Sequence, residues 1–197
     1  MNRAFVVFAS PHTHGATRAL CDAFASGLTP DRWTVTEWDV CQKQAAPCTA
    51  CGYCKTVDGC VLHDLDDFDA ALRACDLLVI ASPVYNLAFP AQLKAVLDRF
   101  QRYFEARFAR GVRPAIAKPR RAVLLLTMGR HDSFSVEVCE KMLRQSFSVM
   151  NTRLVGALCL TDTDSGVREN DPIFEKARTM AIEIEKETCY NNLNLCD

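Results

Sequence analysis

The chain of 197 residues is 49% hydrophobic and 24% charged, which fits one globular domain with a substantial core. Its formal net charge of -1 provides no overall attraction to nucleic acid or to an anionic membrane. No stretch approaches the roughly 18 apolar residues of a membrane span, and the first apolar run, residues 4–9, is too short for a signal-peptide core. We therefore expect a cytoplasmic protein that binds neither membranes nor nucleic acid.

The chain contains eleven cysteines. In a small secreted chain they would indicate a disulfide scaffold, but this chain is larger and is not expected to be secreted. Free thiols or metal ligands are therefore the better interpretation.

The first predicted strand, residues 4–9, runs into a loop rich in Ser, Gly and Thr that opens a helix. A helix start presents unpaired N–H groups and the positive end of the helix dipole, so it favours a phosphate. The side chains that could assist are Ser10, His12, Thr13, His14 and Thr17, and Gly15 would let the backbone approach the ligand. The alternative is an ordinary β–α turn capped by serine or threonine.

A second strand is predicted at residues 33–38 and a helix at 64–75, with a structureless cysteine-rich insertion between them. The apolar run 77–81 reads as a strand buried on both faces. It ends in Ser82-Pro83-Val84-Tyr85-Asn86, which offers a fixed turn and a flat aromatic face suited to a planar heterocycle. The alternative is a proline turn with a packed tyrosine.

The remaining elements complete an alternating pattern of strands and helices. They are an amphipathic helix through residues 93–104, an irregular segment 105–120, a strand 122–127 with a loop 128–132, a helix 134–150, a strand 154–160 and a closing helix around 173–184. Five strands alternating with five helices predict a doubly wound α/β sheet. Ligands of such sheets bind beyond the carboxyl ends of the strands, so the loops after strands 1, 3 and 4 should converge.

The insertion carries a C-x2-C-x2-C-x5-C motif made of Cys48, Cys51, Cys54 and Cys60. Four thiolates at this spacing match the ligands of a [4Fe-4S] cluster. Zinc is an alternative, although its cysteines more often arrive as two separated C-x2-C pairs. Reduced thiols or a disulfide in a loop without a cofactor remain the other alternative.

Three motifs in this order resemble the flavodoxin-like NADPH-dependent FMN reductases, and within them the iron-sulfur flavoproteins most. The motifs are Ser10-Pro11-x3-Gly15-x-Thr17, the Cys48 motif with Cys60-Val61-Leu62-His63-Asp64, and Ala81-Ser82-Pro83-Val84-Tyr85 followed by Gln92-Leu93-Lys94-Ala95-Val96-Leu97-Asp98-Arg99. The resemblance covers about residues 4–160. The chain departs from the family at His12, where a basic residue is frequent, at Ala16, where asparagine is frequent, and at His63-Asp64-Leu65.

The resemblance implies one flavodoxin-like FMN-binding domain over residues 1–197, with a parallel sheet in the order 2-1-3-4-5, a cysteine-rich loop 41–63 and a basic flap 105–120. It also implies a homodimer or homotetramer in which the cluster approaches a flavin of the same or a neighbouring chain. The electron partners would be small-molecule donors and acceptors, with NAD(P)H and ferredoxin as candidates. The implied FMN contacts are Ser10, His12, His14, Gly15, Ala16 and Thr17 for the phosphate, and Pro83, Val84, Tyr85, Asn86, Met128 and Gly129 for the ring.

Residues 99–121 contain eight basic residues and a single acidic one. A solvated or subunit-facing flap beside the flavin is the favoured interpretation, because the net charge offers no wider basic surface. Nucleic-acid binding through the interleaved aromatic residues and recognition of the NADPH 2′-phosphate are the alternatives.

The sequence therefore predicts an FMN-dependent oxidoreductase with a [4Fe-4S] cluster, in which the flavin performs the chemistry and no side chain acts as a nucleophile. One alternative is a cluster-free NAD(P)H-dependent reductase of quinones, nitroaromatics or flavin. Another is a redox-sensing or zinc-binding interaction protein without turnover. The signatures of dinucleotide-binding Rossmann folds, P-loops and hydrolase elbows are missing.

Overall fold

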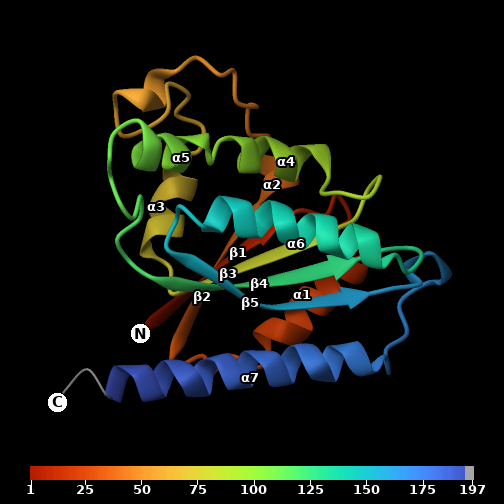
Figure 1. Cartoon of the computed structure of the whole chain (residues 1–197). Helices are drawn as coiled ribbons and strands as arrows, with labels where there is room; N and C mark the ends of the chain where they lie inside the picture. The colour runs from red at the N-terminus through yellow and green to blue at the C-terminus, as the bar shows by residue number, and fades with distance from the viewer. Residues whose placement is uncertain (194–197) are drawn as a thin grey trace.

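The computed structural model describes residues 1–193, with side chains described through Thr188. Its centre is a five-stranded parallel sheet in the order β2-β1-β3-β4-β5, as predicted (Figure 1). The strands are β1 (Asn2–Phe8), β2 (Trp33–Asp39), β3 (Leu77–Pro83), β4 (Arg120–Thr127) and β5 (Thr152–Leu160).

Helices cover both faces of the sheet (Figure 1). One face carries α1 (Ala16–Ala25) and α7 (Pro172–Leu193), and the other carries α3 (Asp66–Ala74), α4 (Ala91–Asp98), α5 (Gln101–Phe108) and α6 (Ser133–Phe147). Three short elements complete the fold: α2 (Val40–Lys43) and the 3-10 turns η1 (Tyr53–Lys55) and η2 (Thr163–Ser165). None of the helices in the described part of the chain has the length and apolar character needed to cross a membrane.

The central strands are buried because both of their faces are covered. Every residue of β3 is buried, whereas the edge strand β2 exposes the four residues from Thr34 to Glu37. On the α3 side, Phe68 packs edge-on against Phe5 and Trp38, with ring centroids 5.2 and 5.6 Å away. On the other side, Gly27 lets the end of α1 approach α7 so closely that a Cβ there would overlap the carbonyl oxygen of Arg178.

Two predictions about the irregular regions are wrong in part. The insertion is not structureless, because the Asp39 carboxylate accepts hydrogen bonds from the N–H groups of Cys41 (2.8 Å) and Gln42 (3.1 Å) and starts α2, and η1 follows later. The flap 105–120 is helical through Phe108, because burial of Tyr103 and Ala106 stabilises α5. The structure also has more than the five helices predicted, since the helix expected at 93–104 divides into α4 and α5.

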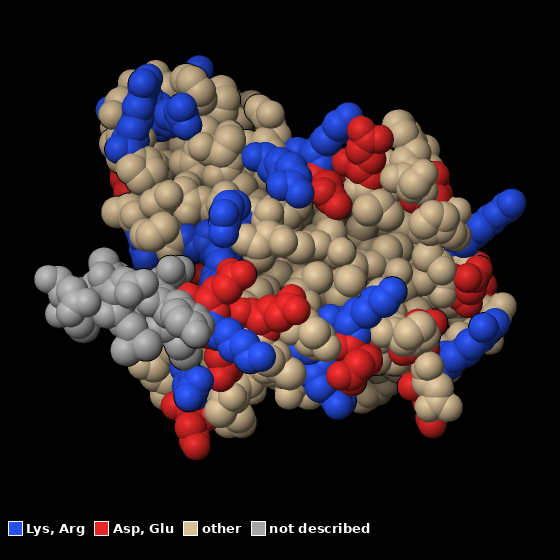
Figure 2. Space-filling model, turned by 60° about the horizontal axis from the view of Figure 1, so that its bottom comes forward, with Lys and Arg blue, Asp and Glu red and all other residues tan. Residues whose placement is uncertain are grey.

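The face covered by α7 carries a mixture of acidic and basic side chains (Figure 2), in agreement with the net charge near zero. A buried carboxylate fixes α7 to the turn before β2. Glu185 accepts hydrogen bonds from the N–H and the hydroxyl of Thr29, both at 2.8 Å, and pairs with Arg32 at 3.3 Å. Burial alone would raise the pKa of Glu185, but the hydrogen bonds from Thr29 and the charge of Arg32 hold it below its ordinary value.

We predict that Glu185→Gln lowers the free energy of unfolding by about 1–3 kcal/mol at pH 7, because it removes a charged hydrogen-bond acceptor. The carboxylate contributes its full stability above the ordinary glutamate pKa of about 4.3, and this contribution is lost as the pH falls through the lower pKa of the folded state. Urea unfolding between pH 7 and pH 3 measures the effect, with the exposed Glu183→Gln on the same helix as control. A difference between wild type and variant that stays constant with pH would contradict the assignment.

Candidate functional site

A pocket of about 820 Å³ opens at the carboxyl ends of β1, β3, β4 and β5. Eleven of the twelve residues predicted to contact FMN line it, and the exception is His14, which is exposed. The loops after strands 1, 3 and 4 therefore converge, as expected. The lining residues are Ser10, His12, Gly15, Ala16, Thr17, Pro83, Val84, Tyr85, Asn86, Leu87, Thr127, Met128, Gly129, Arg130, Asp132, Ser135, Thr163, Asp164, Gly166 and Val167.

The loop after β1 forms a polar cradle at the start of α1. The Ser10 hydroxyl accepts a hydrogen bond from the N–H of His12 (3.2 Å), which curls the loop. The N-cap residue of α1 is Gly15, and no side chain makes a capping hydrogen bond there, so the first N–H groups of the helix remain available to a ligand. The Thr17 hydroxyl is buried and shares a hydrogen bond of 2.8 Å with Thr127 of β4. A helix start of this kind is a suitable place for an anion.

The loop after β3 forms a tight hairpin at the mouth of the pocket. Tyr85 and Ala88 exchange backbone hydrogen bonds of 2.9 and 3.1 Å, and Tyr85 is 45% exposed. The two residues between them, Asn86 (φ 49°) and Leu87 (φ 68°), both adopt left-handed backbone conformations. Asn is common in such turns, but Leu is not, because its Cβ crowds the backbone there. The turn at the mouth of the pocket is therefore strained at Leu87.

The pocket also contains residues that the sequence analysis missed, and Asp164 of η2 is the most informative. A Cβ at Gly129 would overlap the Asp164 carboxylate, so the absence of a side chain at Gly129 lets this carboxylate lie against the loop after β4. The N–H of Met128 donates to Leu160 (3.0 Å), which joins this loop to the end of β5. No sequence motif links residues this far apart, which explains the omission.

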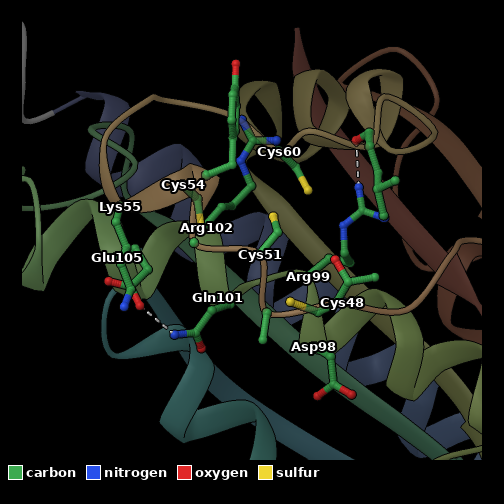
Figure 3. Close-up of a pocket in the computed structure, with 15 residues that line it drawn as sticks. Cys48, Cys51, Cys54, Lys55, Cys60, Asp98, Arg99, Gln101, Arg102 and Glu105 are labelled. Carbon is green, nitrogen blue, oxygen red and sulfur yellow. Dashed lines mark hydrogen bonds between the residues drawn. The ribbon is translucent and has the colours of Figure 1, made fainter.

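A second cavity, of about 390 Å³, lies between the cysteine-rich insertion and the α4–α5 junction (Figure 3). All four cysteines of the predicted motif line it: Cys48, Cys51, Cys54 and Cys60. In residues 1–188 no three His, Cys, Asp or Glu side chains form a group that could hold a metal ion, so the four sulfur atoms surround the cavity rather than meet at one point. The nine cysteines described there are all free thiols; Cys189 and Cys196 lie outside the described side chains.

Arg99, between α4 and α5, fastens both ends of the insertion. Its guanidinium donates to the carbonyl oxygens of Ala46 (2.9 Å) and Leu62 (2.7 Å) and pairs with the Asp64 carboxylate at 2.9 Å. Asp64 in turn accepts from the N–H of Ala46 (2.7 Å). Burial of Arg99 disfavours its charge, but the hydrogen bond with Asp64 and the proximity of Cys60 raise its pKa overall.

Within one chain, the basic segment lies away from the pocket predicted to bind flavin. Helix α5 packs against η1 of the insertion, and no residue of 99–121 lines the pocket at the carboxyl ends of the strands. Arg110 and Arg73 hold the Asp58 carboxylate of the insertion at 3.1 and 3.4 Å. Burial opposes the charge of Asp58, but the hydrogen bond from Arg110 and the charge of Arg73 lower its pKa. The arginines therefore anchor the cysteine loop.

The model of a family described as having a flavodoxin-like fold matches residues 2–184. The chain belongs to this family. Part of the chain is similar to an iron-sulfur flavoprotein of Methanosarcina thermophila, with 44% identity over 61 residues, which are 30% of this chain and 32% of the relative. Another iron-sulfur flavoprotein, from Archaeoglobus fulgidus, is 30% identical over 102 residues, which are 51% of this chain and 46% of the relative. An FMN-dependent NADH:quinone oxidoreductase of Pectobacterium atrosepticum is 33% identical over 101 residues, 50% of this chain and 46% of the relative.

These matches span less than half the length of the curated relatives. Among solved structures, an NAD(P)H:quinone oxidoreductase from Methanothermobacter marburgensis superposes with a TM-score of 0.67 at 18% identity, over 92% of both chains. An azoreductase from Bacillus anthracis gives a TM-score of 0.65 at 15% identity, over 93% of this chain and 98% of that one. At this identity the solved structures show a shared fold.

We predict that Leu87→Gly raises the free energy of unfolding by about 0.5–1 kcal/mol relative to Leu87→Ala. Glycine adopts the left-handed conformation without the Cβ penalty of about 1–2 kcal/mol, and its larger chain entropy offsets part of the gain. Urea unfolding of both variants measures the difference. Equal stabilities would contradict the strain assigned to this turn.

Proposed function

We propose that the chain is a cytoplasmic FMN-dependent oxidoreductase that carries a [4Fe-4S] cluster and passes electrons between a reduced donor and a small-molecule acceptor. The observation that carries the proposal is the presence of two separate cavities in one chain: one is lined by four cysteines, and the other opens at the carboxyl ends of the strands. The similarity to iron-sulfur flavoproteins over the stretches that match supports the same assignment.

The residues of the larger pocket fit FMN. Its volume suits a nucleotide-sized ligand, and the start of α1 beside Ser10 offers hydrogen-bond donors to a phosphate. The turn from Pro83 to Tyr85 offers a flat, largely apolar surface to a planar ring. A bound flavin would supply the redox chemistry, and the chain's residues would bind the phosphate and orient the ring.

The smaller cavity fits a cluster better than a single ion. An all-thiolate set of four is the usual ligand set of a [4Fe-4S] cluster. A zinc ion needs four sulfur atoms about 2.3 Å from one centre, whereas these four surround an open cavity. Arg99 and Arg102 in the cavity wall would oppose the negative charge of the thiolates. A zinc-binding or redox-sensing protein is the weaker interpretation.

The two sites share no lining residue, and in Figure 1 the cysteine insertion lies above α5, away from the arrowhead ends of the strands. This separation supports a homodimer or homotetramer in which the cysteine cavity of one chain approaches the flavin pocket of its neighbour. NAD(P)H or a ferredoxin would supply the electrons.

A second candidate is a cluster-free NAD(P)H-dependent reductase of quinones, nitroaromatics or flavin. The shared fold with the quinone oxidoreductase and the azoreductase over more than nine-tenths of this chain favours it. In that case the cysteine loop would have another role.

Anaerobic purification followed by absorption spectroscopy and quantification of FMN, iron, sulfide and zinc separates these candidates. We predict flavin bands with about four iron and four sulfide per chain. Cys54→Ala should lose most of the iron and keep FMN, because Cys54 lines only the cysteine cavity. Cys41→Ala, in the same insertion but outside the cavity, is the matched control. Flavin without iron, from cells able to assemble clusters, would select the cluster-free reductase.

The phosphate position is tested by the double variant Ser10→Ala, Thr17→Ala. Loss of two hydroxyls near a charged phosphate should weaken FMN binding by about tenfold or more, since one hydrogen bond to a charged group contributes about 1.5–3 kcal/mol. Quenching of flavin fluorescence gives the dissociation constant, and circular dichroism confirms folding. Thr13→Ala, which is exposed and does not line the pocket, is the control. Unchanged FMN affinity in the double variant would refute this position.

A further inference from the structure

Two arginines one helical turn apart form part of the wall of the cysteine cavity. The side chains of Arg99 and Arg102 are only 3% and 12% exposed. In the described part of the chain, the Nε–H of each is buried and has no hydrogen-bond partner. Arg107, Arg110 and Arg120 share this feature outside the cavity, so the position of their guanidinium groups in the cavity wall is what distinguishes Arg99 and Arg102.

Arg102 lies close to the loop that carries the last cysteine of the motif. Its Nη2 is 3.9 Å from the position of a Cβ at Gly59, the residue before Cys60, and Figure 3 draws Arg102 in the same part of the cavity wall as Cys60. Arg102 and Cys60 also line a small adjoining pocket together. The guanidinium is therefore within reach of sulfur atoms held in the cavity.

The charge of Arg102 is only partly neutralised by the protein. Its ion pair with Asp69 is long, at 3.4 Å, and Asp69 also binds Arg73 at 2.9 Å and the hydroxyl of Tyr103. Two carboxylates line the same cavity, but Asp98 is paired with Lys94 at 2.6 Å and Glu105 accepts from Gln101 at 3.0 Å. Glu105 keeps its charge, because the Gln101 amide is neutral, but Figure 3 shows it beside Lys55 and apart from Arg99 and Arg102, so the arginines form a positive side of the cavity.

We infer that Arg99 and Arg102 are positioning residues that set the reduction potential of the cluster, an inference that rests on the proposed function. Their guanidinium groups lie in the wall of the cavity that the four cysteines line. Uptake of one electron from the reduced donor adds one negative charge there, and the nearby guanidinium charges stabilise that reduced state. Arg99 also closes the loop through Ala46 and Leu62, so Arg102 is the residue on which tuning can be tested separately.

Redox titration of the anaerobically purified holoprotein, followed by electron paramagnetic resonance, tests this inference. Arg102→Gln should make the reduced cluster about tenfold less abundant at a fixed ambient potential, which is a shift of about -59 mV for one electron. Arg102→Lys keeps the charge but lacks the planar fork, so its shift should be smaller and of the same sign. Arg107→Gln, on the same helix but outside the cavity, should leave the potential unchanged.

Iron and sulfide content, measured on the same samples, separates the two levels of the proposal. A wild-type protein without iron would overturn the proposed cluster and the inference with it. A loaded wild type, with Arg102→Gln fully loaded at the wild-type potential, would overturn the inference alone. If Arg102→Gln fails to assemble a cluster, Arg102→Lys decides: a lowered potential supports tuning, and an unchanged potential refutes it.

Discussion

The parallel hydrogen bonding of β1, β3 and β4 is the constraint on which the larger site depends. Phe8 is in register with Ala81, and Pro83 with Thr127, so the chain leaves these strands at nearly the same level of the sheet. After β1 the chain enters α1 on one face, and after β3 it enters α4 on the other. The opposite directions of these connections leave a crevice between the two loops, and this is where doubly wound sheets bind ligands.

The cysteine insertion depends on a different force. It forms no part of the sheet, and ion pairs with Arg99 and Arg110, which flank α5, hold it instead. The Arg99 side chain is almost fully buried, so its pairing with Asp64 and two carbonyl oxygens is weakly screened by water and restricts the loop far more than a surface ion pair would. The two sites thus have different physical origins: backbone pairing shapes one, and electrostatic pairing shapes the other.

The features that could be predicted from the sequence are those that follow from a local pattern of residues. Apolar runs predicted the buried strands, and the fixed spacing of the cysteines predicted that they share a cavity. Two contacts were not predictable, those of Arg99 with Asp64 and of Asp164 with Gly129. Each joins residues about 35 positions apart in the sequence, and no sequence pattern links the two segments. The part of α5 after residue 104 was not predicted, because the arginines of this segment obscure the helical spacing of the buried Tyr103 and Ala106 in the sequence.

The closure of the insertion by Arg99 has a consequence for the biogenesis of the protein. Many small metal-binding domains fold only when the metal arrives, so chains made during iron shortage are exposed to proteases. Here the ends of the cysteine loop are held by protein groups alone, and the sheet does not involve the loop. Under the proposed function, the Arg99 contacts would hold the ends of the loop whether or not the cysteines bind a cluster, so the fold of the sheet would not depend on the supply of iron.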